Sequence, residues 1–186
     1  MTKPLTVTDT IECLISAEEI AARVTSLAQE ISKKLPPDLM IVSLLRGSFM
    51  FTSDLIRALH HVGANTIRPQ IDFMTLASYG NRITSSGEIQ VARDLVEDVE
   101  GRDVLIVDDI LESGRTLAYA KNIIKERKAR SVQIVVLLEK PGKRVAENVN
   151  ADFVGFVIPD KFVVGYGLDY ANYYRELPFI GVVTIN

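Results

Sequence analysis

The chain has 186 residues, of which 47% are hydrophobic and 24% are charged, proportions that are typical of one ordinary globular domain. Its net charge of −3 gives no bulk attraction to nucleic acid or anionic lipid, and its longest apolar runs are far too short to cross a bilayer. We therefore expect no nucleic-acid partner and no membrane partner. Only a basic patch on one face, which composition does not exclude, would allow nucleic-acid binding.

The N-terminal part of the chain predicts one long helix. Residues 18–35 follow Ser16 as the N-cap, and Glu19 stands three positions later, which is the spacing of a capping box. Two prolines, Pro36 and Pro37, end the helix. Just before it, Cys13 is the only cysteine, which favours a reducing, cytoplasmic compartment. Because Cys13 lies in an apolar run, we expect it to be a small core residue.

Short apolar runs alternate with segments of helical period through the middle of the chain. Buried strands are predicted at residues 40–45, 71–77, 104–107, 132–138 and 153–157, with helices at 48–61 and 115–128. This alternation indicates an α/β fold with a parallel sheet that is covered on both faces. Residues 165–174 and 179–185 predict a separate strand-and-turn element.

One segment, residues 78–88, is polar and has almost no apolar anchor; it begins with Ser78, Tyr79 and Gly80. Polar loops of this length in a compact domain are either mobile lids or disordered connections. Composition alone does not separate the two interpretations.

The segment that carries chemistry is residues 104–116, which read Val-Leu-Ile-Val-Asp-Asp-Ile-Leu-Glu-Ser-Gly-Arg-Thr. A buried strand is followed by two acids, a short turn and the start of a helix, and ligands of open α/β sheets bind beyond the carboxyl ends of the strands. A turn that leads into a helix presents free backbone N–H groups and a positive dipole end, which suit a phosphate. Gly114 permits close approach of the backbone, and the hydroxyls of Ser113 and Thr116 add donors.

The three acids of this segment, Asp108, Asp109 and Glu112, need a separate explanation. Carboxylates suit sugar hydroxyls and Mg²⁺, which commonly joins a few carboxylates to substrate phosphates. Acids near the positive end of a helix are also a structural feature, but that interpretation accounts for one acid better than for three within five residues. The segment therefore predicts a site for a phosphorylated sugar with free hydroxyls.

This stretch resembles the phosphoribosyl pyrophosphate (PRPP) signature of the type I phosphoribosyltransferases. From about residue 11 to residue 185 the chain resembles the hypoxanthine(-guanine) phosphoribosyltransferases within that family. The resemblance implies one domain, residues 1–186, with a central parallel sheet flanked by helices and a small hood formed by residues 1–16 and 160–186. It also implies Mg²⁺ as cofactor, and a homo-oligomer, either a dimer or a tetramer.

The activity implied is purine salvage: hypoxanthine, and also guanine, would react with PRPP to give IMP or GMP and pyrophosphate. Glu112 would be the catalytic base. The PRPP and phosphate site would contain Asp108, Asp109, Ser113, Gly114, Arg115 and Thr116; the pyrophosphate site would contain Arg46, Gly47 and Arg175, with a cis peptide bond between Arg46 and Gly47. The purine would contact Lys140, Phe162, Val163 and Asp169, the metal would be held by Asp108, Asp109 and Asp169, and Ser78 and Tyr79 would begin a lid.

Glu112 stands where this family commonly has aspartate. The extra methylene lets the carboxylate reach about 1.5 Å farther and adds one torsion that must be fixed. We still assign Glu112 as the base, although its carboxylate could instead position the purine by hydrogen bonding. Asp108 stands where glutamate is frequent, a change of less consequence because either acid serves ribose hydroxyls or metal.

Other interpretations stay open from the sequence. Without the resemblance, Arg46 and Gly47 form a strand-ending turn, Lys140 is a solvated lysine and Phe162 is a core aromatic residue. A regulatory protein that senses PRPP and binds RNA or DNA is a different class of function; the acidic balance and the matching Lys140, Phe162 and Asp169 argue against it. A xanthine-preferring transferase is the nearer alternative.

Overall fold

The computed structural model describes residues 10–62, 67–79, 88–146 and 148–184. Its elements are β1 (Thr10–Ile15), α1 (Ala17–Lys34), β2 (Leu39–Leu45), α2 (Phe49–Val62), β3 (Gln70–Tyr79), β4 (Glu88–Arg93), β5 (Asp103–Leu111), α3 (Arg115–Glu126), β6 (Ser131–Glu139), β7 (Phe153–Val157), β8 (Val163–Val164) and β9 (Ile180–Thr184). The predicted α/β alternation is confirmed from β2 to β7.

A six-stranded sheet forms the centre of the molecule, in the order β4-β3-β2-β5-β6-β7. The pairs β2–β3, β2–β5, β5–β6 and β6–β7 are parallel, as predicted. The edge strand β4 runs antiparallel to β3 and was not predicted. Its sequence, Glu-Ile-Gln-Val-Ala-Arg, lacks the continuous apolar run of a strand that is buried on both faces.

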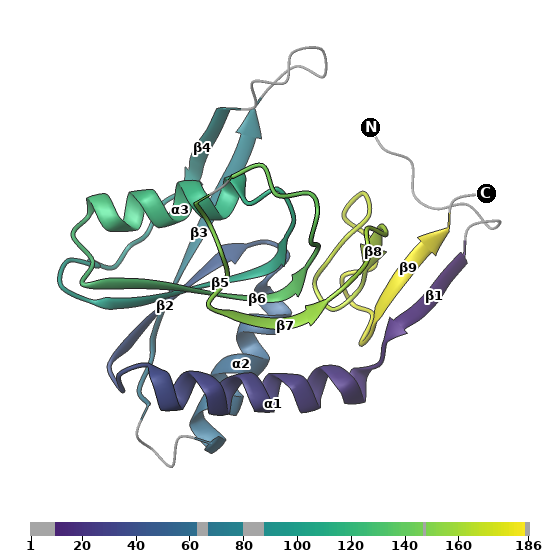
Figure 1. The fold of residues 1–186 in the computed structure, drawn as a ribbon, viewed down its shortest axis with the longest axis horizontal. Coiled ribbons are helices and arrows are strands. Elements are labelled where there is room, and N and C mark those ends of the chain that lie inside the picture. Colours follow the sequence, from purple (N-terminus) through teal and green to yellow (C-terminus); the bar gives the residue numbers. More distant parts are fainter. Residues whose placement is uncertain (1–9, 63–66, 80–87, 147, 185–186) are drawn as a thin grey trace.

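Helices cover both faces of this sheet, with α1 and α2 on one face and α3 on the other (Figure 1). The sheet residues divide accordingly between two apolar clusters. In β5, Leu105 and Val107 pack toward the α1–α2 side, whereas Val104 and Ile106 pack toward the α3 side. Because successive side chains of a strand point to opposite faces, a strand covered on both faces must be apolar throughout, which explains the uninterrupted runs in the sequence.

Helix α1 begins as the capping box predicts. The Glu19 backbone N–H donates to the Ser16 hydroxyl at 3.2 Å, and the Ser16 backbone N–H donates to the Glu19 carboxylate at 2.8 Å. The helix ends where Leu35 becomes extended, as expected for a residue that precedes proline. Among the described residues, no helix combines the length and the apolar character that a membrane span requires.

A second, small sheet joins the two ends of the described chain, in the order β1-β9-β8, and lies beyond the β7 side of the central sheet (Figure 1). Strand β1 runs antiparallel to β9. The expectation that Cys13 is a core residue is wrong, because its side chain is exposed. Strand β1 is an edge strand in which only Ile15, at its end, is buried, so an apolar run there does not imply a core position.

The predicted lid, residues 78–88, lies mostly outside the described residues, which stop at 79 and resume at 88. Within this segment the structure describes the backbones of Ser78 and Tyr79, the last residues of β3, and of Glu88, the first residue of β4, with which Tyr79 pairs.

Candidate active site

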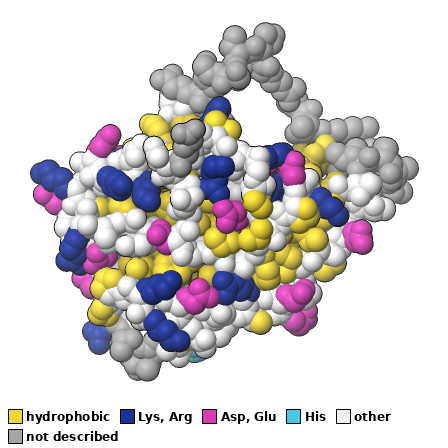
Figure 2. Space-filling model, viewed as in Figure 1, with side chains coloured by type: hydrophobic (Ala, Val, Ile, Leu, Met, Phe, Trp, Pro, Cys, Tyr) yellow, Lys and Arg dark blue, Asp and Glu magenta, His cyan; other side chains and the backbone are white. Residues whose placement is uncertain are grey.

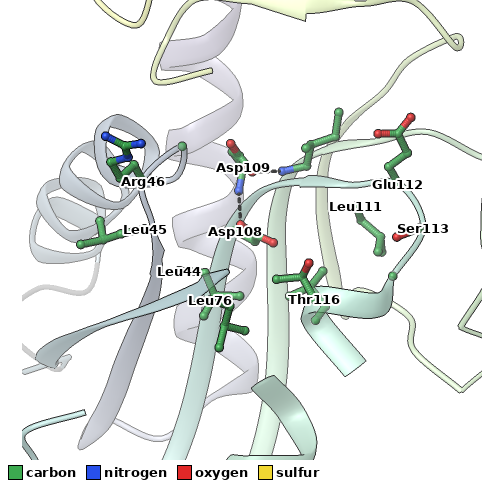
Figure 3. Close-up of a pocket in the computed structure, with 14 residues that line it drawn as sticks. Leu44, Leu45, Arg46, Leu76, Asp108, Asp109, Leu111, Glu112, Ser113 and Thr116 are labelled. Atoms are coloured by element: carbon green, nitrogen blue, oxygen red, sulfur yellow. Dashed lines mark hydrogen bonds between the residues drawn. The ribbon is translucent and has the colours of Figure 1, made fainter. Parts of the chain in front are cut away.

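Three parallel strands bring the predicted site residues to one edge of the sheet. Strands β2, β5 and β6 lie side by side, so the segments after Leu45, Leu111 and Glu139 emerge together. A pocket of about 310 Å³ opens there. It is lined by Leu44, Leu45, Arg46, Gly47, Leu76, Asp108, Asp109, Ile110, Leu111, Glu112, Ser113, Gly114, Thr116 and Leu117. In Figure 3 the two aspartates lie between the Arg46 loop and the turn that begins with Glu112.

The turn between β5 and α3 has the features of an anion-binding loop. Gly114 is the N-cap of α3, with φ of 78° in the left-handed region, where glycine is favoured. It supplies no side-chain cap, and no acidic residue stands in the first turn of the helix. Gly114 and Thr116 line the pocket, so the start of α3 lies there with the positive end of the helix dipole, an arrangement that suits a phosphate.

The acidic pair Asp108 and Asp109 belongs to β5 itself rather than to the turn after it, since the strand continues to Leu111. The Asp109 N–H donates to the Asp108 carboxylate at 3.0 Å, and the Ile110 N–H donates to the Asp109 carboxylate at 2.8 Å. Burial, together with the neighbouring Asp109 charge, raises the pKa of Asp108 well above its ordinary value. Burial also raises the pKa of Asp109. Two adjacent carboxyls of this kind call for a positive partner.

The donor chemistry of this pair fits Mg²⁺, which prefers carboxylate oxygens and usually takes its remaining ligands from water and substrate phosphates. Within the described ranges, no group of three or more His, Cys, Asp or Glu side chains is placed to hold a metal by itself. A divalent ion at Asp108 and Asp109 would therefore be shared with a phosphorylated substrate.

The loop after β2 packs directly against the acidic pair. A Cβ atom at Gly47 would collide with the Asp109 carboxylate, and one at Gly167 would collide with the Gly47 carbonyl. The predicted cis peptide bond is one residue earlier than expected: it joins Leu45 to Arg46, immediately at the end of β2, rather than Arg46 to Gly47. Arg46 is exposed at the rim of the pocket.

A second pocket, of about 450 Å³, adjoins the first. It is lined by Asp109, Ile110, Glu112, Lys140, Lys143, Asp160, Phe162, Val163, Leu168 and Asp169. Asp109, Ile110 and Glu112 line both pockets. The predicted phosphate site and the predicted purine site are thus neighbours that meet at Glu112.

The second pocket combines an ammonium group with an apolar ring. The side chain of Lys140 is only 7% exposed, and its Nζ lies 3.6 Å from Glu112 Oε1, so it is not a solvated surface lysine. Phe162 is 50% exposed rather than a core residue, and its ring meets that of Tyr170 edge-on at 5.6 Å between centroids. Val163, in β8, is buried and lines the pocket.

Arg175 forms an ion pair with Asp169, which lines the second pocket. Arg175 Nη2 lies 2.7 Å from Asp169 Oδ1, and its Nη1 donates to the Gly167 carbonyl at 2.6 Å. The other Asp169 oxygen accepts from the Asn172 backbone N–H at 2.7 Å. Arg175 therefore reaches the Gly47 loop through Gly167 rather than lining either pocket.

Most residues predicted from the sequence converge on these two pockets. Arg115 points to the exposed side of α3 and lines neither pocket, and the side chains of Ser78 and Tyr79 lie outside what the structure describes. Two charged residues of the second pocket, Lys143 and Asp160, were not predicted. The available signal was weak: Lys143 follows Lys140 by three residues in a loop, and Asp160 lies two residues before Phe162.

Comparison with known proteins agrees with this geometry. Residues 14–171 match the model of the phosphoribosyl transferase domain family. The hypoxanthine phosphoribosyltransferase of Escherichia coli K12 is 44% identical over 179 residues, with 95% of this chain and 97% of the relative covered. The hypoxanthine-guanine phosphoribosyltransferase of Bacillus subtilis 168 is 46% identical, with 94% of each chain covered.

Solved structures give the same result. The crystal structure of a hypoxanthine phosphoribosyltransferase from Staphylococcus aureus matches with a TM-score of 0.85 and 42% identity, covering 93% of this chain and 91% of that one. Fold, pocket residues and sequence identity over nearly the whole length all agree. The chain therefore belongs to the type I phosphoribosyltransferase family and, within it, to the hypoxanthine(-guanine) phosphoribosyltransferases.

Proposed function

We propose that this chain transfers the ribose 5-phosphate of PRPP to hypoxanthine, and also to guanine, releasing pyrophosphate and forming the purine nucleotide. The observation that carries the proposal is that an anion-binding pocket and a ring-binding pocket share Glu112 and Asp109 as a common wall. Such an arrangement suits a reaction that joins a phosphorylated sugar to a planar base. The relatives with high coverage are named as enzymes of this kind, which favours an enzyme over a PRPP-sensing regulator.

We assign the 5-phosphate of PRPP to the turn formed by Ser113, Gly114, Arg115 and Thr116, where the N–H groups of α3 are available. The pyrophosphate would lie toward Arg46 and Gly47, with Arg175 contributing positive charge from behind. As the bond to pyrophosphate breaks, negative charge accumulates on the leaving group, and fixed donors at that position stabilise the transition state.

The purine would occupy the second pocket. Its ring would lie against the half-exposed Phe162, its 6-oxo group would accept from buried Lys140, and its edge would meet the backbone of Val163. Glu112 stands where both pockets meet, so we assign it as the base that accepts the ring proton as the purine nitrogen attacks the anomeric carbon.

Mg²⁺ is the proposed cofactor. Asp108 and Asp109 would hold it, with Asp169 close by, and when bound it supplies charge neutralisation to pyrophosphate oxygens. Ser78 and Tyr79 are proposed as the start of a lid that excludes water. We also propose a single domain over residues 1–186, with a hood from residues 1–16 and 160–186, a cytoplasmic location and a homo-oligomeric state; the small β1-β9-β8 sheet supports the hood.

The test is an assay of the purified protein with Mg²⁺ and PRPP, with hypoxanthine, guanine, xanthine and adenine supplied separately. We expect consumption of hypoxanthine and guanine, and loss of turnover when EDTA removes the metal. Glu112→Gln is expected to lower kcat by about a hundredfold or more, the scale of general-base catalysis.

The matched control is Glu126→Gln, which makes the same change at an exposed position at the end of α3 and should leave kcat unchanged. If PRPP binds but no base reacts, the chain is a sensor and the enzymatic proposal fails. If xanthine reacts faster than hypoxanthine, the substrate assignment is wrong although the reaction class stands.

A further inference from the structure

Two lysines and two acids that line the second pocket form four ion pairs with one another; they are Lys140, Lys143, Glu112 and Asp160. Lys143 Nζ lies 3.2 Å from Glu112 Oε1 and 2.7 Å from Asp160 Oδ1. Lys140 Nζ lies farther from the same two atoms, at 3.6 Å and 3.9 Å. Lys143 is therefore the closer partner of both carboxylates.

The two lysines differ in burial. The Lys140 side chain is 7% exposed and lies inside the pocket, whereas that of Lys143 is 46% exposed and lies at its rim. A purine oxygen that accepts a hydrogen bond from the Lys140 ammonium would draw that group away from Glu112 and Asp160. Lys143 would still be paired with both of them, so the Glu112 carboxylate would keep a fixed cationic neighbour throughout the reaction.

The loop that carries Lys143 is anchored to the turn that carries Glu112. The N–H groups of Val145 and Ala146 donate to the Ser113 carbonyl at 2.9 and 3.0 Å, and the Lys140 N–H donates to the Leu111 carbonyl at 3.0 Å. These bonds hold the backbone of residues 140–146 against the backbone on both sides of Glu112. The backbones that carry Lys143 and Glu112 are thus hydrogen-bonded to each other, so the two side chains do not belong to independent loops.

We propose that Lys143 is a positioning residue for the reaction: it orients the Glu112 carboxylate toward the purine by bridging Glu112 to Asp160. The inference rests on the proposed role of Glu112 as base. Glutamate has one more torsion than aspartate, so its carboxylate needs a partner to select one orientation. A partly exposed ion pair contributes little to stability, and we therefore expect the effect of Lys143 in kinetics rather than in folding.

The test compares Lys143→Met, Lys143→Arg and the control Lys125→Met, which removes the same charge from an exposed position on α3. Lys143→Met is expected to lower kcat by about tenfold, as for a misplaced catalytic group, while the KM for PRPP stays unchanged. Lys143→Arg should restore most of the loss, and Lys125→Met should match the unsubstituted enzyme.

The decisive step combines the change with Glu112→Gln. If Lys143 acts through Glu112, Lys143→Met has no further effect on kcat in the Glu112→Gln background, because coupled residues are not additive. Effects that multiply, or a Lys143→Met enzyme as active as Lys125→Met, would overturn the inference.

A crystal structure of Lys143→Met tests the same contact without turnover. We expect the Glu112 carboxylate to leave its present orientation or to occupy more than one; an unchanged Glu112 rotamer would contradict the proposal. If the unsubstituted protein does not use hypoxanthine, the proposed function fails on that result, and the Glu112 rotamer still decides the role of Lys143.

Discussion

At the scale of single residues, the geometry of the candidate active site depends on Gly47, where no side chain larger than hydrogen fits beside the Asp109 carboxylate. Gly47 lies so close to Asp109 that any Cβ atom would overlap the acid, while Gly167 closes on the Gly47 carbonyl from the other side. The loop after β2, the acidic strand β5 and the segment that contains Gly167 are therefore packed closely around the Asp109 carboxylate and the Gly47 carbonyl. This packing fixes the acidic pair relative to Arg46 and Gly47, the proposed site of the pyrophosphate.

Gly47→Ala is expected to displace the Asp109 carboxylate, because the new methyl group has no other space. The resulting overpacking should cost about 1–3 kcal/mol of stability. It should also lower kcat/KM for PRPP, while KM for the purine changes little. Urea denaturation and steady-state kinetics measure the two effects.

The control for that change is Gly101→Ala. Gly101 has φ of 69° and nothing within 4 Å of its Cβ position, so alanine there should carry only a backbone cost, about 1 kcal/mol, with kinetics unchanged. Equal kinetics in the Gly47→Ala and Gly101→Ala enzymes would refute the packing argument.

At the scale of elements, the ends of helices and strands are fixed by polar contacts whose strength can be tested one at a time. Helix α1 begins in a reciprocal capping box at Ser16 and Glu19. Strand β5 begins at Asp103, whose carboxylate accepts from Arg130 Nε at 3.0 Å and from the Ser131 hydroxyl at 2.5 Å, which ties β5 to the start of β6.

Ser16→Ala removes the acceptor for the Glu19 N–H, and we expect a loss of about 1 kcal/mol in the free energy of unfolding. Thr25→Ala is the control, because the exposed Thr25 hydroxyl donates to the Ala21 carbonyl within the same helix. That control should change stability by less than about 0.5 kcal/mol. Chemical denaturation followed by circular dichroism distinguishes the two.

The Asp103 contacts make a prediction about pH. Hydrogen bonding from Arg130, opposed by burial and aided by Ser131, lowers the pKa of Asp103 below its ordinary value. The folded pKa is thus lower than the unfolded pKa of about 3.9, so the stabilisation is fully present above the unfolded pKa and is lost as the pH falls through the folded pKa. Asp103→Asn should therefore cost stability at pH 7, and the difference should vanish at low pH.

Urea midpoints at several pH values between neutral and strongly acidic check this. Asp38→Asn serves as control, since the Asp38 side chain is 81% exposed and 3.5 Å from Arg102, and a pair of that kind contributes little. A difference between wild type and Asp103→Asn that persists unchanged at low pH would show that the Asp103 charge is not what stabilises this strand end.

At the scale of the whole molecule, the two apolar clusters on either side of the sheet account for the fold. On the surface, hydrophobic side chains gather in a band across the face that carries β7 and the C-terminal segment, and charged side chains of both signs border this band (Figure 2). Val157, at the end of edge strand β7, is 65% exposed. An exposed apolar edge is a feature that association would cover.

We predict that the protein is a homo-oligomer in solution, with a mass of two or four times the 20.6 kDa of one chain. Light scattering coupled to size-exclusion chromatography measures this directly. A mass of one chain across the micromolar range would refute the prediction.

By itself, the sequence determined the parallel central sheet, the helices, the α1 capping box and the turn at Gly114. These follow from local patterns: apolar runs for doubly covered strands, helical period, and side chains that bond to neighbouring backbone. The same local reasoning located Asp108, Asp109 and Glu112 at the end of one strand. The sequence resemblance added the residues of distant segments.

Only the tertiary structure decided how those segments meet. The antiparallel β4, the exposure of Cys13 and the place of the cis bond at Leu45–Arg46 depend on pairing and packing between parts of the chain far apart in sequence. The four-charge set of Glu112, Asp160, Lys140 and Lys143 arises in the same way. Such contacts have no local signature, because the residues become neighbours only when the parallel strands bring their carboxyl ends to one edge of the sheet.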